Sequence, residues 1–305
     1  MSIDKKLIVI LGPTASGKTE FSLKLAKKYS ALGGPASGWN GAEIVSADSR
    51  QVYKGMDIGS GKITKKEMQG IPHYLLDVAN PKRKFTVSQY QKLALKSIKN
   101  IQRKNKLPIL VGGTGFYIQS VVDGIIIPEV KPNWELRKEL EKLTTEEMFE
   151  KLKKLDSKRA EIIDKNNPRR LIRALEIVLI TGNAVPVLST KKQQFNILQI
   201  GIKKSPEELK KLIKKRLLKR LKNNAMINEV KKLHKSGLSF KRLEEFGLEY
   251  RFVAQYLQNK ITFQEMIDKI QIESEHYAKR QMTWFKRDNR IIWVNNYKEA
   301  EKLFK

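Results

Sequence analysis

The sequence predicts an α/β fold in which helices flank a parallel sheet and a helical module interrupts the sheet domain. Three observations support this fold class. Short apolar runs of strand length alternate with stretches of helical spacing as far as residue 113. A glycine-rich turn joins the first run to the first helix, and beyond about residue 132 two helical stretches follow with little strand signal. The length of 305 residues, 40% of them hydrophobic, suits about two globular domains.

The first strand and the turn after it are the most informative elements. Leu7-Ile8-Val9-Ile10-Leu11 is wholly apolar, as expected of a buried parallel strand, and a helix is expected over 20–29. The turn between them fits G-x-x-x-x-G-K-[ST] with Gly12, Pro13, Thr14, Ala15, Ser16, Gly17, Lys18 and Thr19. In such a turn the backbone N–H groups face a phosphate, the lysine adds a mobile cation, and the final hydroxyl binds Mg²⁺. The sequence therefore predicts a P-loop for a di- or triphosphate, with Thr19 as the metal ligand.

Two further strands are expected over 43–47 and 107–111, and the second ends at Gly112-Gly113. Helical spacing over 88–104 separates them. Strands that alternate with helices form parallel sheets, which bind ligands at the carboxyl ends of their strands. The expected core is therefore a P-loop NTPase-like parallel sheet, with its site at that edge.

The second half of the chain changes in texture. Helical spacing over 134–155 and 159–181 predicts a helical insertion domain, and an apolar run over 197–201 marks the return to the sheet. Helices are expected from there to residue 286, followed by a late strand over 290–294. The expected domains are a core of 1–131 with 195–305 and an insertion of 132–194. The stretch 33–38, rich in Gly, Ser and Pro, is expected to be a surface loop.

The chain is strongly basic, with 61 Lys and Arg against 32 Asp and Glu, a formal net charge of +29. Such a charge attracts polyanions such as nucleic acid, and basic residues are concentrated over 203–235. A bias toward lysine on solvated helix faces would give the same composition, so composition alone does not decide between these interpretations.

Cysteine is absent from the chain, which excludes disulfides, cysteine-ligated zinc and thiol catalysis. Apolar runs stay well short of the ~18 residues that a membrane span needs, and no signal-peptide core precedes the first strand. We therefore expect a soluble cytoplasmic protein without a membrane partner.

Two aspartates end apolar runs and are candidates for acid–base or metal chemistry. Asp48 follows the second strand and is succeeded by Ser49, Arg50 and Gln51, whose amide can bond to a base edge. Asp77 follows Tyr74-Leu75-Leu76 and has the pattern of a Walker-B acid. Each aspartate is also a common turn or helix cap, and spacing alone leaves that alternative open.

Four blocks of sequence closely resemble the bacterial tRNA dimethylallyltransferases, also called tRNA isopentenyl transferases. These blocks are the P-loop, residues 46–59 (Ser-Ala-Asp-Ser-Arg-Gln-Val-Tyr-Lys-Gly-Met-Asp-Ile-Gly), residues 110–117 (Leu-Val-Gly-Gly-Thr-Gly-Phe-Tyr) and residues 277–288 (Tyr-Ala-Lys-Arg-Gln-Met-Thr-Trp-Phe-Lys-Arg-Asp). They follow the family's order along most of the chain. The resemblance implies transfer of a dimethylallyl group from dimethylallyl diphosphate to N6 of the adenosine after the anticodon, in tRNAs that read codons beginning with U.

The resemblance also implies roles for individual residues in the transfer. Asp48 would take the proton of the adenine amine, and Thr114 would lie near that amine. Lys18, the P-loop amides and a Mg²⁺ ion on Thr19 would stabilise the departing diphosphate. An arginine is expected to assist, and the spacing favours Arg220, with Arg216 second.

For the tRNA, the resemblance implies contacts with the anticodon stem-loop from the sheet edge and from the insertion, which would clasp the stem. No obligate protein partner is implied. The implied contact residues are Asp48, Ser49, Arg50, Gln51, Thr114, Arg137, Arg169, Arg170, Leu171, Ile172 and Arg173. Arg169 stands where the family usually has Gln, so a base-specific amide contact there is not expected. The segment after Arg220 is shorter than usual, so the loop that follows departs from the family pattern.

Other functions remain open on the residues alone. A nucleotide kinase would place ATP on the same loop, although Gly112-Gly113-Thr114 stands where a strand-end acid would help it. A non-catalytic RNA-binding protein would keep the basic surface without the chemistry. A prenyl transferase acting on free adenine nucleotides would need neither the insertion nor so many basic residues.

Overall fold

The computed structural model describes residues 6–31, 38–128, 130–187, 189–190 and 195–304. The chain divides into two compact units, one of residues 1–124 with 192–305 and one of residues 125–191. We call them the core unit and the helical unit. The loop expected over 33–38 lies, except for Gly38, outside the described residues.

The core unit is built on one parallel sheet of six strands in the order β3-β2-β4-β1-β5-β6. The strands are β1 (Lys6–Leu11), β2 (Ala42–Ala47), β3 (His73–Tyr74), β4 (Leu107–Gly112), β5 (Asn196–Ile202) and β6 (Ile291–Val294). The strands expected near 7–11, 43–47, 107–111, 197–201 and 290–294 are confirmed, and β3 was not anticipated because it has only two residues. The sheet and its flanking helices confirm the α/β class.

Side chains of β1 alternate between two hydrophobic clusters, one on each face of the sheet. Leu7, Val9 and Leu11 join one cluster, while Ile8 and Ile10 join the other. Both sets are almost completely buried, because β4 and β5 pair with β1 on its two sides and helices cover both faces. This explains why the first apolar run shows no alternation of polar and apolar residues.

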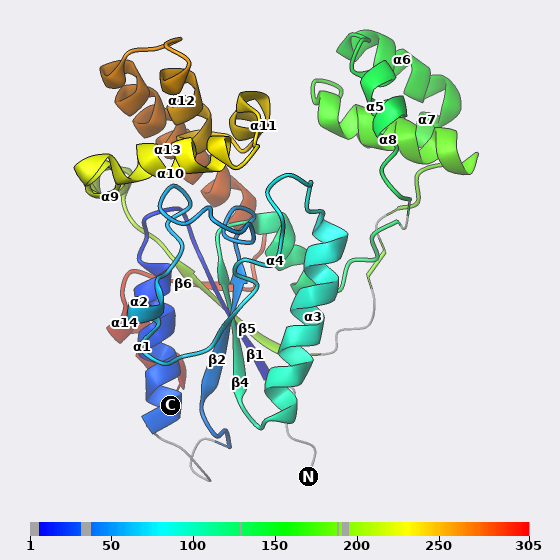
Figure 1. Ribbon diagram of the computed structural model, residues 1–305. Coiled ribbons are helices and arrows are strands. Elements are labelled where there is room, and N and C mark those ends of the chain that lie inside the picture. The colour runs from blue at the N-terminus through cyan, green and yellow to red at the C-terminus, as the bar shows by residue number, and fades with distance from the viewer. Residues whose placement is uncertain (1–5, 32–37, 129, 188, 191–194, 305) are drawn as a thin grey trace. The chain divides into compact units, whose positions relative to one another are not determined.

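Helices cover the two faces unequally (Figure 1). Helix α1 (Lys18–Ala31) lies on one face with α14 (Tyr297–Glu301), and α3 (Val87–Arg103) and α4 (Gly115–Val122) lie on the other. Beyond the carboxyl ends of the strands gather α9 (Pro206–Leu221), α10 (Ala225–Lys235), α11 (Phe240–Glu245), α12 (Leu248–Leu257) and the amino-terminal part of α13 (Phe263–Phe285). Short helices are α2 (Lys65–Met68) and the 3₁₀ turns Lys222–Asn224 and Lys302–Phe304.

The helical unit consists of α5 (Trp134–Leu140), α6 (Thr145–Leu155), α7 (Ser157–Ile162) and α8 (Pro168–Thr181) around its own apolar core. Each of the two helices expected over 134–155 and 159–181 is therefore divided. Thr144 forms a capping box with Glu147 and starts α6, and Asn167 with Pro168 starts α8.

The boundaries of the helical unit are 125 and 191 rather than the expected 132 and 194. Ile125 pairs with Thr190 in an antiparallel bridge, and Arg173 donates to the carbonyl of Val130 at 3.1 Å. These bonds tie the segment before residue 132 to the helical unit. Among the described helices, none is long and apolar enough to cross a membrane.

Candidate active site

The P-loop connects β1 to α1 and is shaped by residues with positive φ. Gly12 has φ 148° and Gly17 has φ 89°, and a Cβ on Gly12 would lie 2.6 Å from the carbonyl oxygen of Ile202. Ala15 also has φ 63°, which is unusual for a residue with a side chain. The loop closes on itself, because the carbonyl of Pro13 accepts from Ser16 N at 3.3 Å and from Lys18 Nζ at 2.6 Å.

A cavity of about 590 Å³ lies over this loop in the core unit. It is lined by P-loop residues 14–19 and by side chains from the ends of β2 and β4 and from α9 and α13. The carboxyl ends of adjacent parallel strands meet here, as expected for an α/β site. Gly12 and Pro13 shape the loop but do not line the cavity.

Cations outnumber carboxylates along the cavity, which is lined by Lys18, Lys215, Arg216, Lys219 and Arg220 against Glu20 and Asp48. Burial of the Lys18 ammonium, together with the charge of Arg216, lowers the pKa of Lys18 to about 7, although Asp48 acts in the opposite direction. Crowded cations of this kind are costly unless an anion joins them. The cavity is therefore suited to a ligand with several negative charges, such as a diphosphate.

Arg216 is the arginine in direct contact with the P-loop. Its Nη2 donates to Thr14 Oγ1 at 2.6 Å. Burial and the neighbouring Arg220 lower the pKa of Arg216 to about 10, so it remains a cation at neutral pH. Arg220, which sequence spacing favoured, lines the same cavity but forms an ion pair with Glu249 at 2.8 Å. The geometry favours Arg216 for contact with the loop, because it lies one turn earlier on α9 and faces the loop, and the role expected of Arg220 stays a prediction.

Asp48 and Thr114 lie at neighbouring strand ends, after β2 and β4. Asp48 Oδ1 accepts from Arg50 N at 2.7 Å and from Gln51 N at 3.2 Å. One oxygen of this carboxylate therefore caps the turn, as the alternative interpretation expected. Thr114 Oγ1 accepts from Ser49 N at 3.0 Å, and Thr114 N donates to Ala47 O at 3.1 Å. These bonds hold both strand ends together and fix the Asp48 carboxylate at the cavity wall.

Other predicted contact residues at this edge are partly engaged inside the protein. The oxygen of the Gln51 amide accepts from Ser46 Oγ at 3.3 Å, and its Nε2 donates to Gly61 O at 3.2 Å. Arg50 Nε donates to Phe246 O at 2.7 Å. Gln51 is thus part of the cavity wall. One N–H of its amide is bound to Gly61, so only the other could donate to a base edge.

Asp77 lies in a different environment from Asp48. It accepts from Lys62 Nζ at 2.6 Å, and the same ammonium contacts Asp57 at 2.6 Å. Asp77 has φ 58° and does not line the cavity. The structure therefore favours the turn interpretation of Asp77 over a Walker-B role.

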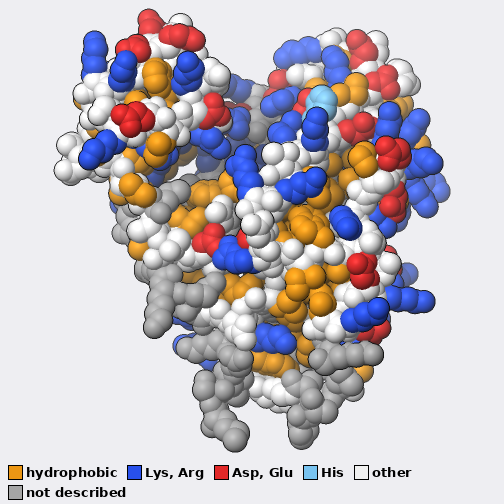
Figure 2. All heavy atoms as spheres, turned by 180° about the vertical axis from the view of Figure 1, so that it is seen from behind, with side chains coloured by type: hydrophobic (Ala, Val, Ile, Leu, Met, Phe, Trp, Pro, Cys, Tyr) orange, Lys and Arg blue, Asp and Glu red, His pale blue; other side chains and the backbone are white. Residues whose placement is uncertain are grey.

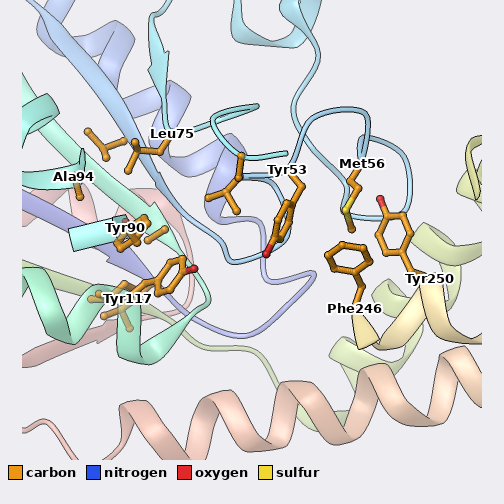
Figure 3. Close-up of a cluster of buried hydrophobic side chains, with 14 of the residues drawn as sticks. Tyr53, Met56, Leu75, Tyr90, Ala94, Tyr117, Phe246 and Tyr250 are labelled. Atoms are coloured by element: carbon orange, nitrogen blue, oxygen red, sulfur yellow. The ribbon is translucent and has the colours of Figure 1, made fainter. Parts of the chain in front are cut away.

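Aromatic side chains pack behind Asp48 in the core unit. The rings of Tyr90 and Tyr117 stack with centroids 3.9 Å apart, and Tyr90 OH donates to Ser46 O at 3.0 Å. Figure 3 shows these two tyrosines side by side, with Tyr53 further along the same cluster. Burial, with the Asp48 charge as a smaller contribution, raises the pKa of both Tyr90 and Tyr117, so they remain neutral.

The arginines predicted to bind tRNA from the helical unit fall into two groups. Arg137 binds the buried Glu176 carboxylate with two bonds, of 2.7 and 2.6 Å, and Arg173 also pairs with Glu176. Burial alone would raise the pKa of Glu176, but the bonds from Arg137 and Arg173 outweigh it and the pKa is lowered. Arg169 and Arg170 are exposed and lie in the first turn of α8, where Arg170 forms a long, exposed ion pair of 3.7 Å with Asp164.

Leu171 and Ile172 do not offer side chains to a partner. Leu171 is 0% and Ile172 8% exposed, and both belong to the core of the helical unit. The expectation that they contact tRNA stays a prediction that concerns their backbone, because the helical period that places Arg169 and Arg170 outside turns the next two side chains inward.

Positive charge is not gathered into one patch on the face that Figure 2 shows, where Lys and Arg are interspersed with Asp and Glu. Of the basic residues over 203–235, Lys215, Arg216, Lys219 and Arg220 line the cavity. Four cations of this segment therefore border the cavity, and its other basic residues do not line it.

A bound Mg²⁺ ion was expected on Thr19. The described residues contain no cluster of three His, Asp or Glu side chains that could hold a metal alone. Thr19 and Asp48 line one cavity, and the buried Oγ of Ser16 has no hydrogen-bond partner there. Mg²⁺ commonly takes one or two protein oxygens with phosphate oxygens and water, so these residues fit an ion that enters with its diphosphate.

Comparison with known proteins gives this geometry a context. The family model described as IPP transferase matches residues 51–288. The chain belongs to the IPP transferase family. A tRNA dimethylallyltransferase of Anoxybacillus flavithermus is 40% identical over 295 residues, which cover 95% of this chain and 90% of the relative. Another, of Caldanaerobacter subterraneus, is 38% identical and covers 98% of this chain and 95% of the relative.

Solved structures agree with the family. A full-length tRNA isopentenylpyrophosphate transferase of Bacillus halodurans has a TM-score of 0.71 at 35% identity, over 99% of this chain and 95% of that one. A eukaryotic dimethylallyltransferase, described as acting on tRNA, has a TM-score of 0.78 at 24% identity, over 98% of this chain and 76% of that one. The second likeness shows a shared fold.

In this IPP transferase, sequence reasoning missed two residues of α13 at the site. Gln281 Oε1 accepts from Thr14 N at 2.7 Å and Gln281 Nε2 donates to Gly113 O at 2.7 Å, which clamps the P-loop to the end of β4. Tyr277 lies one turn earlier and lines the cavity, where burial and the Asp48 charge raise its pKa to about 12. Both residues lie in the block 277–288 that the resemblance used, but their partners are distant in sequence.

Proposed function

We propose that this IPP transferase moves a dimethylallyl group from dimethylallyl diphosphate to N6 of the adenosine after the anticodon of a tRNA. One observation carries the proposal: a carboxylate and a cation-lined phosphate loop share a single cavity. The names of the relatives, tRNA dimethylallyltransferase and tRNA isopentenylpyrophosphate transferase, support the same reaction.

The donor diphosphate would bind the P-loop beside Lys18 and Arg216. Cleavage of the allylic C–O bond leaves both electrons and a growing negative charge on the diphosphate. Lys18, Arg216 and the loop amides are already in place for that charge, so little reorganisation is needed during the step. Mg²⁺, held by Thr19 and the diphosphate, would supply further charge stabilisation.

The acceptor amine would approach from the Asp48 side of the cavity. The lone pair of N6 is delocalised into the adenine ring, so the amine is a poor nucleophile. As the new C–N bond forms, N6 loses one proton, which we assign to Asp48 Oδ2, because Oδ1 already accepts from Arg50 and Gln51. Thr114, bonded to Ser49 N, would orient the amine, and the products are N6-(dimethylallyl)adenosine and diphosphate.

The target base of the anticodon stem-loop would leave the base stack and enter this cavity. Among the residues of the helical unit, Arg169 and Arg170 are the ones that we propose for phosphate contacts. Arg137 and Arg173 are tied to the buried Glu176 and have less freedom to reach a phosphate.

The proposal is tested by incubating the protein and Mg²⁺ with an anticodon stem-loop and either dimethylallyl diphosphate or ATP. The RNA is then digested to nucleosides, and their masses are measured by mass spectrometry. We expect an adenosine heavier by one dimethylallyl group only with the prenyl donor. Transfer of phosphate from ATP would support the kinase alternative instead. Prenylation of free adenosine monophosphate in place of the stem-loop would identify the small-acceptor enzyme, and no product under any condition would favour a binding protein.

A further inference from the structure

Residues 57–61, which we call the wall loop, are held by a carboxylate from a distant helix. Glu229 on α10 accepts from three successive amides, at 2.8 Å from Asp57 N and 2.6 Å from Ile58 N to Oε2 and at 3.0 Å from Gly59 N to Oε1. Successive backbone N–H groups that converge in this way form an anion-binding nest. Here the protein fills the nest with its own carboxylate.

Tyr250 completes the arrangement. Its hydroxyl donates to Glu229 Oε1 at 2.8 Å and accepts from Ser60 N at 3.1 Å, so four successive amides of the wall loop are fixed. The ring lies against Gly59, where an added Cβ would be 2.7 Å from a ring carbon. Figure 3 shows Tyr250 and Phe246 projecting toward the loop that carries Met56. Burial and the Glu229 charge raise the pKa of Tyr250, so its phenol keeps its proton.

The wall loop in turn holds two side chains that line the cavity. Gly61 O accepts from Gln51 Nε2 at 3.2 Å, and Gly59 O accepts from Arg220 Nη1 at 3.0 Å. The same Nη1 donates to Glu249 at 2.8 Å, and the guanidinium leaves no room for a Cβ on Gly61. The Arg220 cation is thus fixed from two sides, directly by Glu249 and through the wall loop by Glu229.

We propose that Glu229 is a positioning residue of the transfer site. It does not line the cavity and acts through the wall loop, which holds Arg220 for the donor diphosphate and Gln51 beside Asp48. The inference rests on the proposed prenyl transfer. A small displacement of groups that surround a reacting centre is enough to slow it by about 10²-fold, so loss of the nest should be visible in the kinetics.

The alternative is that Glu229 only fastens α10 to the wall loop and has a purely structural role. The two interpretations differ in what a variant loses. If Glu229 only fastens α10, its substitution should lower the Tm and weaken the donor and tRNA steps together. If Glu229 is a positioning residue, its substitution should raise the KM for dimethylallyl diphosphate and lower kcat, with the affinity for tRNA unchanged.

The test compares Glu229→Gln with wild type by steady-state kinetics, tRNA binding and hydrogen exchange. The variant keeps the size of the side chain but places an NH₂ group where Glu229 accepts N–H bonds. We expect kcat/KM for the donor to fall by roughly 10- to 100-fold, with faster exchange confined to amides 57–60. Glu208→Gln is the matched control, because Glu208 pairs with Lys204 on the exposed start of α9 and should behave as wild type.

Tyr250→Phe removes one hydroxyl and keeps the ring, so it provides a second test even if Glu229→Gln folds poorly. It should shift the same donor parameters by a smaller factor and release the Ser60 amide. Wild-type donor kinetics in both variants, or parallel losses of donor and tRNA binding with a lower Tm, would overturn the proposal. An inactive wild-type enzyme would instead refute the proposed function, and the exchange measurement would still report on the nest.

Discussion

At the scale of single residues, Lys18 gives the site a dependence on pH. Its pKa is lowered to about 7 by burial and by Arg216, and a bound diphosphate would favour its charged form. Below that pKa, Lys18 is charged in both the free and the bound protein. Above it, donor binding must take up a proton, so affinity falls as pH rises until the pKa of the complex is reached.

We therefore expect the Kd for dimethylallyl diphosphate to rise by up to about tenfold per pH unit above pH ~7. Calorimetry in buffers of different ionisation enthalpy measures the proton uptake. Lys18→Ala should weaken binding and remove that uptake. Uptake that persists in Lys18→Ala would assign the proton to another group.

Arg216 and Arg220 should differ in their effects on the donor. Arg216→Gln removes a cation that we propose to bind the diphosphate beside the P-loop, and it should raise the donor Kd by about 10- to 100-fold, the usual worth of a charged hydrogen bond. It should also raise the pKa of Lys18, because the positive charge beside it is lost. Arg220→Gln should have the smaller effect on the donor Kd, since Arg220 is already paired with Glu249, and should act mainly on kcat. Equal donor affinities in Arg216→Gln and wild type would contradict the assignment.

Sequence reasoning found the residues that lie in contiguous motifs and missed those that act over distance. The P-loop, Asp48 and Thr114 each follow a strand within a recognisable block. Gln281 contacts a residue 267 positions away, and Glu229 contacts residues 170 to 172 positions away. A single sequence carries no signal that joins such pairs. The sequence also could not decide which of Arg216 and Arg220 contacts the P-loop, because the two lie one turn apart on the same helix.

At the scale of elements, the helical unit depends on a buried ion network. Glu176 on α8 is fully buried and is bound by Arg137, Arg173 and the backbone N–H of Asn133. Glu176→Gln should destabilise the helical unit by about 3 kcal/mol, because Arg137 and Arg173 lose the anion that pairs them. Hydrogen exchange of the α5, α6 and α8 amides measures this directly, and the core unit serves as the internal reference.

The same network gives a test by acid. The pKa of Glu176 is lowered in the folded protein, so its contribution to stability is present above the unfolded value of 4.5 and is lost as pH falls through the folded value. The wild-type helical unit should therefore lose stability in that acid range, and Glu176→Gln should lose less. Identical acid profiles would show that Glu176 does not anchor the unit.

Element boundaries were the weaker part of the sequence prediction. Strands β1, β2 and β4 were found because each is a short, mostly apolar run that is buried on both faces, and β5 and β6 were found as short apolar runs although they are partly exposed. The break between α5 and α6 was missed, since apolar spacing continues across it and only the Thr144 capping box reveals a new helix. The start of the helical unit was placed late because the bonds of Ile125, Ile126 and Val130 to Thr190, Ser189 and Arg173 involve distant positions.

At the scale of the whole molecule, the charge of +29 should be visible as salt dependence of tRNA binding. Log Kd plotted against log salt should be linear, with a slope of about 0.7 to 0.9 per phosphate contact. Replacing Arg169 and Arg170 with Gln should reduce that slope by about two units, one for each contact, and leave donor binding unchanged.

The matched control replaces Lys27 and Lys99, two exposed lysines on α1 and α3, with Gln. Their loss should leave the slope near its original value. Arg173 is unsuitable for this purpose, because it holds Glu176 and its loss would disturb folding. A slope that falls equally in both double variants would mean that the charge acts only through its total and that α8 makes no particular contact.

The most direct measurement is single-turnover prenylation of an anticodon stem-loop by Asp48→Asn. The amide of this variant keeps an oxygen to which Arg50 N and Gln51 N can donate, so the turn and both binding sites should persist. The account predicts normal affinity for donor and stem-loop, with chemistry slower by about 10²- to 10⁴-fold, the usual worth of a positioned proton acceptor. Prenylation at the wild-type rate by this variant would contradict it.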